Sequence, residues 1–127
     1  MRAIRTDLAP VPRGHYAQAI VHQGLVYVSG QLPIDPEHPE KPAGNIREQT
    51  ERTLQNVEAI LIAAGSELPL LLQVTVYITD LSLWGEVNEV YGTMLGDHRP
   101  ARAIVPVTSL NKGAQIEIQA IAALRTA

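Results

Sequence analysis

NIREQTERTLQNVEAILIAAG, residues 45–65, is the stretch of this 127-residue chain that decides its fold. Apolar and small side chains recur in it at the spacing of one helix face. Asn45 followed three residues later by Glu48 is the pattern of a capping box, and Gly65 supplies a stop. We therefore expect an amphipathic helix between Asn45 and Gly65, whose inward positions are Ile46, Thr50, Leu54, Val57 and Leu61.

The residues that follow predict a strand and then a second helix. Between Leu72 and Thr79 apolar and polar residues alternate with the period of two that is typical of a half-buried strand. Asp80 can cap a helix that ends near Gly96. The side chains expected on one face of that helix are Trp84, Val87, Tyr91 and Met94.

Four further strands flank this central part. Two short strands should be joined by a tight hairpin at Gln23-Gly24, because glycine accepts a positive φ angle. A loop rich in proline and acidic residues, 33–44, separates them from the first helix. The expected strands are Ala17–Ile20, Leu25–Ser29, Ala101–Val107 and Gln115–Leu124, and the predicted order over the single domain 1–127 is ββαβαββ.

This order predicts an α+β domain in which two helices cover one face of a mixed sheet. The other face then needs a partner, because a sheet buries its apolar side chains against a second layer. We expect that partner to be another copy of the chain. Polar residues of the last strand would then lie where two subunits meet, so a site between subunits is possible.

Composition excludes several function classes. The formal net charge is −3 without a block of basic residues, which argues against nucleic-acid binding, and the chain has no cysteine for a thiolate or a Cys-based metal site. Four scattered histidines, interpreted as surface residues, lack metal-ligand spacing, and no glycine-rich phosphate loop is present. Without a signal peptide or an apolar run of membrane-spanning length, the expected location is cytoplasmic.

Two charged residues lie within apolar strands near the end of the chain. Arg102 follows Pro100-Ala101, and Glu117 lies between Ile116 and Ile118. Strand alternation places both at polar-facing positions. One interpretation is a cross-strand ion pair between Arg102 and Glu117, which would be structural only. The other is a site in which both residues act on a ligand.

The segment RPARAIVPVTSLNKGAQIEI, residues 99–118, resembles the signature of the RidA/YjgF family. That signature has a Pro-Ala-Arg strand followed by a strand with Glu between two apolar residues. The likeness extends over nearly the whole chain, including GHYAQA at 14–19, YVSGQLP at 27–33 and VNEVY at 87–91. The chain is thereby identified as a member of this family of reactive-intermediate deaminases.

The resemblance implies a chorismate-mutase-like fold and a homotrimer with clefts between subunits. It also implies hydrolysis of small 2-imino acids or enamines to 2-oxo acids and ammonia, with no cofactor and no metal. In the family the signature arginine, here Arg102, binds the substrate carboxylate through two parallel hydrogen bonds. The acidic residue, here Glu117, would position water and relay protons. Further ligand contacts are expected from Tyr16, Ser29, Gly30 and Asn88.

Two positions differ from the family pattern. Ile104 stands where cysteine is common; its backbone N–H could still bind a ligand, while its bulk would change the pocket. Asn111 stands where Leu-Pro-Lys has its proline. A non-catalytic trimer that binds a small carboxylate and regulates a partner remains an alternative. An endoribonuclease or translation inhibitor is a weaker one, because the chain lacks a basic aromatic groove.

Overall fold

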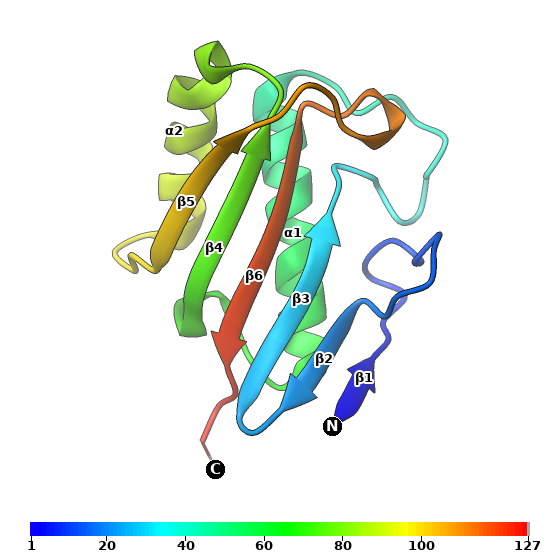
Figure 1. Ribbon diagram of the computed structural model, residues 1–127, viewed down its shortest axis with the longest axis vertical. Helices are drawn as coiled ribbons and strands as arrows, with labels where there is room; N and C mark the ends of the chain where they lie inside the picture. Colours follow the sequence, from blue (N-terminus) through cyan, green and yellow to red (C-terminus); the bar gives the residue numbers. More distant parts are fainter. Residues whose placement is uncertain (127) are drawn as a thin grey trace.

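A computed structural model describes residues 1–126 as two helices packed on one six-stranded sheet (Figure 1). Short 3-10 turns at 68–70, 81–83 and 111–113 link the main elements. The α+β architecture and the two-helix layer are therefore as predicted. The elements are β1 Arg2–Ile4, β2 Ala19–His22, β3 Leu25–Gln31, α1 Ile46–Ala64, β4 Leu71–Ile78, α2 Trp84–Leu95, β5 Ala101–Pro106 and β6 Ile116–Ala123.

The predicted start and stop signals of α1 act as expected. The Asn45 side chain accepts a hydrogen bond from the Glu48 backbone N–H at 2.9 Å, and the Glu48 carboxylate accepts one from the Asn45 backbone N–H at 2.9 Å. Gly65 ends the helix with a φ of 91°, a left-handed conformation that glycine adopts without steric cost. The reciprocal cap fixes where α1 begins relative to the sheet.

The strand order is β1-β2-β3-β6-β4-β5, so the last strand of the chain lies in the middle of the sheet. Only β4 and β5 run parallel, which makes the sheet mixed. The hairpin between β2 and β3 turns at Gln23 and Gly24, both with positive φ, as the sequence predicts. The order matters for the site because β4 separates β5 from β6.

Two details of the strand prediction were wrong. A short edge strand, β1, pairs with β2 before the first predicted strand, so the order is βββαβαββ. Three residues are too few for a period of two to be visible in the sequence. In addition, β3 does not end at Ser29-Gly30 but continues to Gln31, with an irregular register between Val28 and Gln31.

The core lies between the helices and one face of the sheet. Alternate residues of the central strands are fully buried there, as a period of two requires. Examples are Val74, Val76 and Ile78 of β4, Ile116 and Ile118 of β6, and Leu54, Val57 and Leu61 of α1.

The opposite face of the sheet has no second layer among residues 1–126, as the view of Figure 1 makes clear. It carries a mixture of apolar and polar side chains, among them Tyr27, which is 42% exposed. Tyr77 donates a hydrogen bond to Gln119 Oε1 at 3.0 Å across this face. We refer to it below as the open face.

Candidate functional site

Arg102 lies on the helix-covered side of edge strand β5, under α2. In the register of the parallel pair it is opposite Val74, which is 1% exposed and faces the core. Because the sheet ends at β5, the Arg102 side chain can reach past its edge into solvent, and the residue is exposed. The cation is thereby held at the rim of the molecule rather than buried within it.

One face of α2 fixes the guanidinium group of Arg102. Its central carbon lies 4.5 Å from the ring centroid of Trp84 and 4.8 Å from that of Tyr91, and both rings attract the cation. Arg102 Nη1 donates a hydrogen bond to Asn88 Oδ1 at 3.1 Å. No carboxylate forms a salt bridge with Arg102 anywhere in residues 1–126. The cation is therefore oriented but keeps its capacity to bind an external anion.

The Tyr91 hydroxyl is buried and, within the described residues, makes no hydrogen bond of good geometry. Burial raises the pKa of Tyr91, and the nearby positive charge of Arg102 opposes that shift. The phenol accordingly stays protonated at neutral pH. It offers a hydrogen-bond donor beside Arg102.

Glu117 lies on β6 and faces the open side of the sheet, paired in register with Tyr77. Burial raises the pKa of its carboxyl group above the ordinary value of 4.5. A β-carbon on Gly30 would lie 2.5 Å from Glu117 Oε2, closer than real β-carbons approach another atom. The missing side chain at position 30 thus makes room for the carboxylate against β3.

Ser29 and Tyr16 complete the surroundings of Gly30. The Ser29 hydroxyl donates to the Ala17 carbonyl at 2.7 Å, so its hydrogen already has a partner and only its oxygen lone pairs remain for a ligand. Tyr16 is 52% exposed and lines a small hollow together with Gly30. Its ring is therefore available for contact with a ligand or with another chain.

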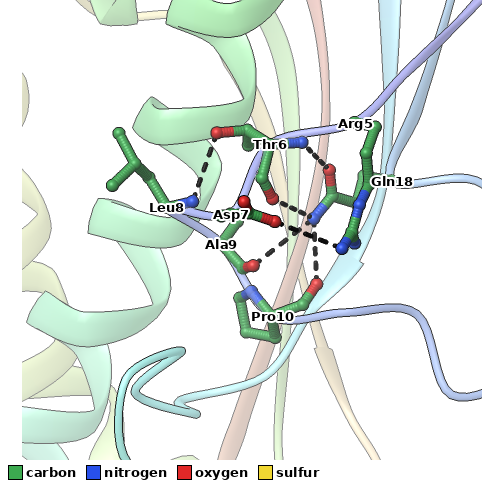
Figure 2. Close-up of polar contacts among 7 residues, drawn as sticks. All are labelled: Arg5, Thr6, Asp7, Leu8, Ala9, Pro10 and Gln18. Carbon is green, nitrogen blue, oxygen red and sulfur yellow. Dashed lines mark hydrogen bonds and ion pairs between the residues drawn. The ribbon is translucent and has the colours of Figure 1, made fainter.

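Gln18 holds residues 6–10 of the N-terminal loop in place (Figure 2). Tyr16 follows later in the same loop. The Gln18 side chain is 1% exposed and accepts a hydrogen bond from the Thr6 backbone N–H at 2.7 Å. It donates to the carbonyls of Thr6 and Pro10, both at 3.0 Å, and to that of Ala9 at 3.4 Å. A buried amide with every hydrogen-bonding atom used fixes a unique loop conformation.

The predicted site residues thus form two clusters in one chain. Asn88, Arg102 and the half-buried Ile104 lie with α2, whereas Ser29, Gly30 and Glu117 lie around the junction of β3 and β6. We call these the arginine cluster and the glutamate cluster. Tyr16 belongs with the second because it shares a hollow with Gly30.

The structural interpretation of Arg102 and Glu117 as a cross-strand ion pair was wrong. Strand β4 lies between β5 and β6, and the two side chains point to opposite faces of the sheet. A period of two gives the alternation within each strand but does not say which strands are neighbours. Within one chain, Arg102 and Glu117 do not meet.

Other site types find no support in the described residues. Residues 1–126 contain no group of three or more His, Asp or Glu side chains placed to hold a metal ion. His15, His22 and His38 are exposed, as predicted, but His98 is half-buried with Nε2 2.7 Å from the Leu71 carbonyl oxygen. No helix in this part of the chain is both long and apolar enough to cross a membrane.

Comparison with known proteins places this geometry in a family. The model of the family described as "Endoribonuclease L-PSP" matches residues 6–124. The chain belongs to the RidA/YjgF family. This family member is 46% identical over 119 residues to a RutC family protein of Pyrococcus abyssi, with 94% of each chain covered.

Two further relatives of this RidA/YjgF protein have more specific names. The 2-iminobutanoate/2-iminopropanoate deaminase of Rattus norvegicus is 39% identical over 121 residues, covering 95% of this chain and 88% of the rat protein. The crystal structure of E. coli TdcF with bound serine superposes with a TM-score of 0.93 at 36% identity, covering 99% of this chain and 100% of the TdcF chain. The family therefore includes an imine deaminase and a protein that holds an amino acid.

The sequence analysis placed Trp84 and Tyr91 of this RidA/YjgF protein on one face of the second helix and missed their contact with Arg102. The spacing of these residues in the sequence already indicated that they share a helix face with Asn88. Trp84, Asn88 and Tyr91 stand at i, i+4 and i+7, which places them on one helix face. Which strand that face would cover could not be read from the sequence.

Proposed function

We propose that the protein hydrolyses small 2-imino acids, or their enamine tautomers, to 2-oxo acids and ammonia. The observation that carries this proposal is the presence of two complementary half-sites. One holds a cation, Arg102, that has no carboxylate partner among residues 1–126, and the other holds a carboxyl group, Glu117, whose pKa is raised by burial. The rat deaminase among the relatives agrees with this chemistry.

Arg102 would bind the carboxylate of the imino acid. A guanidinium group can donate two parallel hydrogen bonds to a carboxylate, which fixes the ligand's orientation as well as its position. Trp84 and Tyr91 hold the group in place before the ligand arrives, so little conformational entropy is lost on binding. The bound serine in TdcF is a ligand with the same carboxylate end.

Glu117 would serve the reaction at the imine carbon. Water adds to that carbon through its oxygen, a proton reaches the nitrogen, and the carbon–nitrogen bond breaks to release ammonia and leave a 2-oxo acid. A carboxylate can accept the proton from water and return it to the nitrogen, and a raised pKa favours this exchange near neutral pH. The imine is already electrophilic, so the proposal requires no metal or organic cofactor.

The other predicted residues have supporting roles in this proposal. Gly30 leaves room for Glu117, and its backbone can approach the ligand closely. Asn88 orients Arg102 through its hydrogen bond, and Ile104 follows on the same side of β5. Tyr16 lines the hollow together with Gly30, and the Ser29 hydroxyl is bonded to the Ala17 carbonyl next to Gly30 in the chain. Either side chain could contact the imine or its water.

The two clusters would meet between copies of the chain. Within one copy, Arg102 and Glu117 are on opposite faces of the sheet, so one ligand needs Arg102 of one copy and Glu117 of another. The open face supplies a surface that a neighbouring sheet can cover. We propose a homotrimer, which is the assembly that the family resemblance implies; like any closed cyclic assembly, it repeats this contact and leaves no unmatched cluster.

Mixing two inactive variants tests this arrangement. Arg102→Ala lacks the first cluster and Glu117→Gln lacks the second, and each alone should be nearly inactive on freshly generated 2-iminopropanoate. Co-expression at equal levels should restore about a quarter of wild-type ammonia release. In randomly mixed oligomers, about one site in four receives an intact Arg102 from one copy and an intact Glu117 from its neighbour. Absence of any recovery in verified mixed oligomers would contradict a shared site.

A non-catalytic binding function is the second candidate, favoured by the serine held in TdcF. Such a protein would bind a 2-oxo or 2-amino acid at Arg102 without releasing ammonia from an imine. Ammonia release above the rate of spontaneous hydrolysis, and its loss in Arg102→Ala, separates the two functions. The measurement uses the wild-type protein at a concentration where its oligomeric state has been determined.

A further inference from the structure

A hollow of about 390 Å³ lies beside Arg102, on the side of α2 that faces the start of β5. Its volume lies within the range that small-molecule sites occupy in proteins. It is larger than the binding of one carboxylate group requires. The side chains and glycines that matter for the argument are Tyr91, Gly92, Gly96, His98, Arg99 and Arg102.

Gly92 leaves the helix side of this hollow open. It lies in the interior of α2, where glycine weakens a helix relative to alanine. A β-carbon at this position would meet no atom within 4 Å, and the backbone φ of Gly92 is not positive. Neither packing nor backbone conformation in residues 1–126 therefore demands glycine here. What the missing side chain does provide is space inside the hollow.

The charged arginine side chains around the hollow are both cationic. Arg99 and Arg102 both line it, and no acidic side chain does so in the described part of the chain. Arg99 donates only to the backbone carbonyl of Asp97, at 3.3 Å, so its charge is not neutralised by a carboxylate there. Two like charges on one hollow repel each other, and an anion between them would relieve that repulsion.

Tyr91 and His98 also make the hollow suitable for an anion. The Tyr91 hydroxyl is buried without a hydrogen-bond partner in residues 1–126, so it can donate to a ligand oxygen. The His98 ring is held by its contact with the Leu71 carbonyl oxygen at 2.7 Å, which keeps the segment leading to Arg99 against β4. The hollow thus combines the fixed segment at His98, the hydroxyl donor of Tyr91 and the second guanidinium group, that of Arg99.

We propose that this hollow is a second anion subsite, in which Arg99 binds the side-chain carboxylate of a ligand whose 2-carboxylate is held by Arg102. The ligand class is a dicarboxylic 2-imino acid, with its 2-oxo acid product. This inference rests on the proposed function and specifies its substrate. All residues that line the subsite belong to a single chain.

Binding of two mimics by calorimetry at constant ionic strength tests the subsite. 2-Oxoglutarate has the second carboxylate, whereas 2-oxobutanoate lacks it. Wild-type protein should bind 2-oxoglutarate about tenfold more tightly or better, since a hydrogen-bonded charge pair typically contributes that much. Arg99→Gln should remove most of this preference. Arg5→Gln is the matched control, because it removes an equal charge at an exposed arginine that pairs with Asp7 outside the hollow.

Filling the hollow gives a second, independent test. Gly92→Leu should weaken 2-oxoglutarate binding at least tenfold more than 2-oxobutanoate binding, because the new side chain occupies the space of the second carboxylate. Gly85→Leu, in the same helix but outside the hollow, should leave the preference intact. Both leucine variants should fold, since leucine is a stronger helix former than glycine.

The outcomes distinguish this inference from the proposed function. Equal affinity for the two mimics, or a preference that survives Arg99→Gln, overturns the subsite even when 2-iminopropanoate is hydrolysed. A preference that disappears in Arg99→Gln and Gly92→Leu supports the subsite even when no imine is hydrolysed. In that second case the deaminase proposal fails and the subsite describes a binding protein.

Discussion

The backbone of Gly30 and the carboxylate of Glu117 lie so close that a β-carbon at position 30 would be 2.5 Å from Oε2. The two residues belong to neighbouring strands, β3 and β6, at the point where their register shifts. The contact shows why glycine follows Ser29 in a strand, where glycine otherwise weakens the structure. The position of the Glu117 carboxylate therefore depends on the absence of a side chain at Gly30.

Gly30→Ala should therefore displace the Glu117 carboxylate while leaving the fold intact. The new methyl group clashes with the far end of a flexible side chain rather than with backbone, so Glu117 can move aside. A displacement of about 1 Å at a reacting group can lower turnover by about two orders of magnitude. We expect at least a tenfold loss of kcat for 2-iminopropanoate with a thermal midpoint close to that of the wild type.

Gly85→Ala is the matched control for this substitution, because a β-carbon there meets no atom within 4 Å. It should leave kcat unchanged. Full turnover in a folded Gly30→Ala protein would show that the contact with Gly30 does not position Glu117 for catalysis.

The raised pKa of Glu117 predicts the pH dependence of turnover. If Glu117 accepts a proton from water, kcat falls as pH drops through the pKa of this group in the enzyme–substrate complex. Burial places that pKa above 4.5, so the acid limb should lie at higher pH than an unperturbed glutamate would give. Steady-state rates between pH 4 and 8, corrected for spontaneous imine hydrolysis, measure it. In Glu117→Gln the residual rate should lack this limb.

The raised pKa of Glu117 gives stability the opposite pH dependence to turnover: turnover rises with pH, whereas stability falls. Burial disfavours the carboxylate, so the folded state binds the proton more tightly than the unfolded state does, and the wild type loses stability as pH rises from the unfolded pKa through the folded one. Glu117→Gln carries no such proton. Its free energy of unfolding relative to wild type should therefore increase across that window and then level off. A constant difference between pH 4 and 8 would contradict burial of the carboxyl group.

Trp84→Leu should weaken ligand binding by releasing Arg102. Leucine keeps a helix-forming apolar side chain but removes the aromatic face that lies 4.5 Å from the guanidinium carbon. A cation–π contact at an exposed site contributes about 0.5–1 kcal/mol, so the Kd for 2-oxobutanoate should rise roughly two- to fivefold. KM should rise with it while kcat changes little, because Trp84 does not touch the reacting atoms.

Trp84→Phe distinguishes orientation of Arg102 from simple packing. Phenylalanine restores an aromatic face of smaller area, so binding should recover most of the way to the wild-type value. Equal weakening in Trp84→Leu and Trp84→Phe would indicate that the shape of tryptophan, and not its attraction for the cation, sets the position of Arg102.

Sequence by itself determined the local structure of this protein and its family. The capping box at Asn45 and Glu48 and the stop at Gly65 define α1 because they satisfy, or end, hydrogen bonds within the same segment. The alternation in β4 and β6 shows which residues share a strand face. The order of helices and strands, and the linked motifs around Arg102 and Glu117, were sufficient to place the chain among RidA/YjgF proteins.

Only the tertiary structure decided where those residues lie relative to one another. The pairing of β6 with β3 and β4 joins segments that are distant in the sequence, and it leaves β4 between the strands of Arg102 and Glu117. The register of β4 with β5 and β6 places the two side chains on opposite faces of the sheet. Periodicity fixes the alternation of side chains along a strand, whereas strand order and facing depend on how apolar surfaces from distant segments pack together. For the same reason, the contact of α2 with Arg102 and the hollow beside it were absent from any local pattern in the sequence.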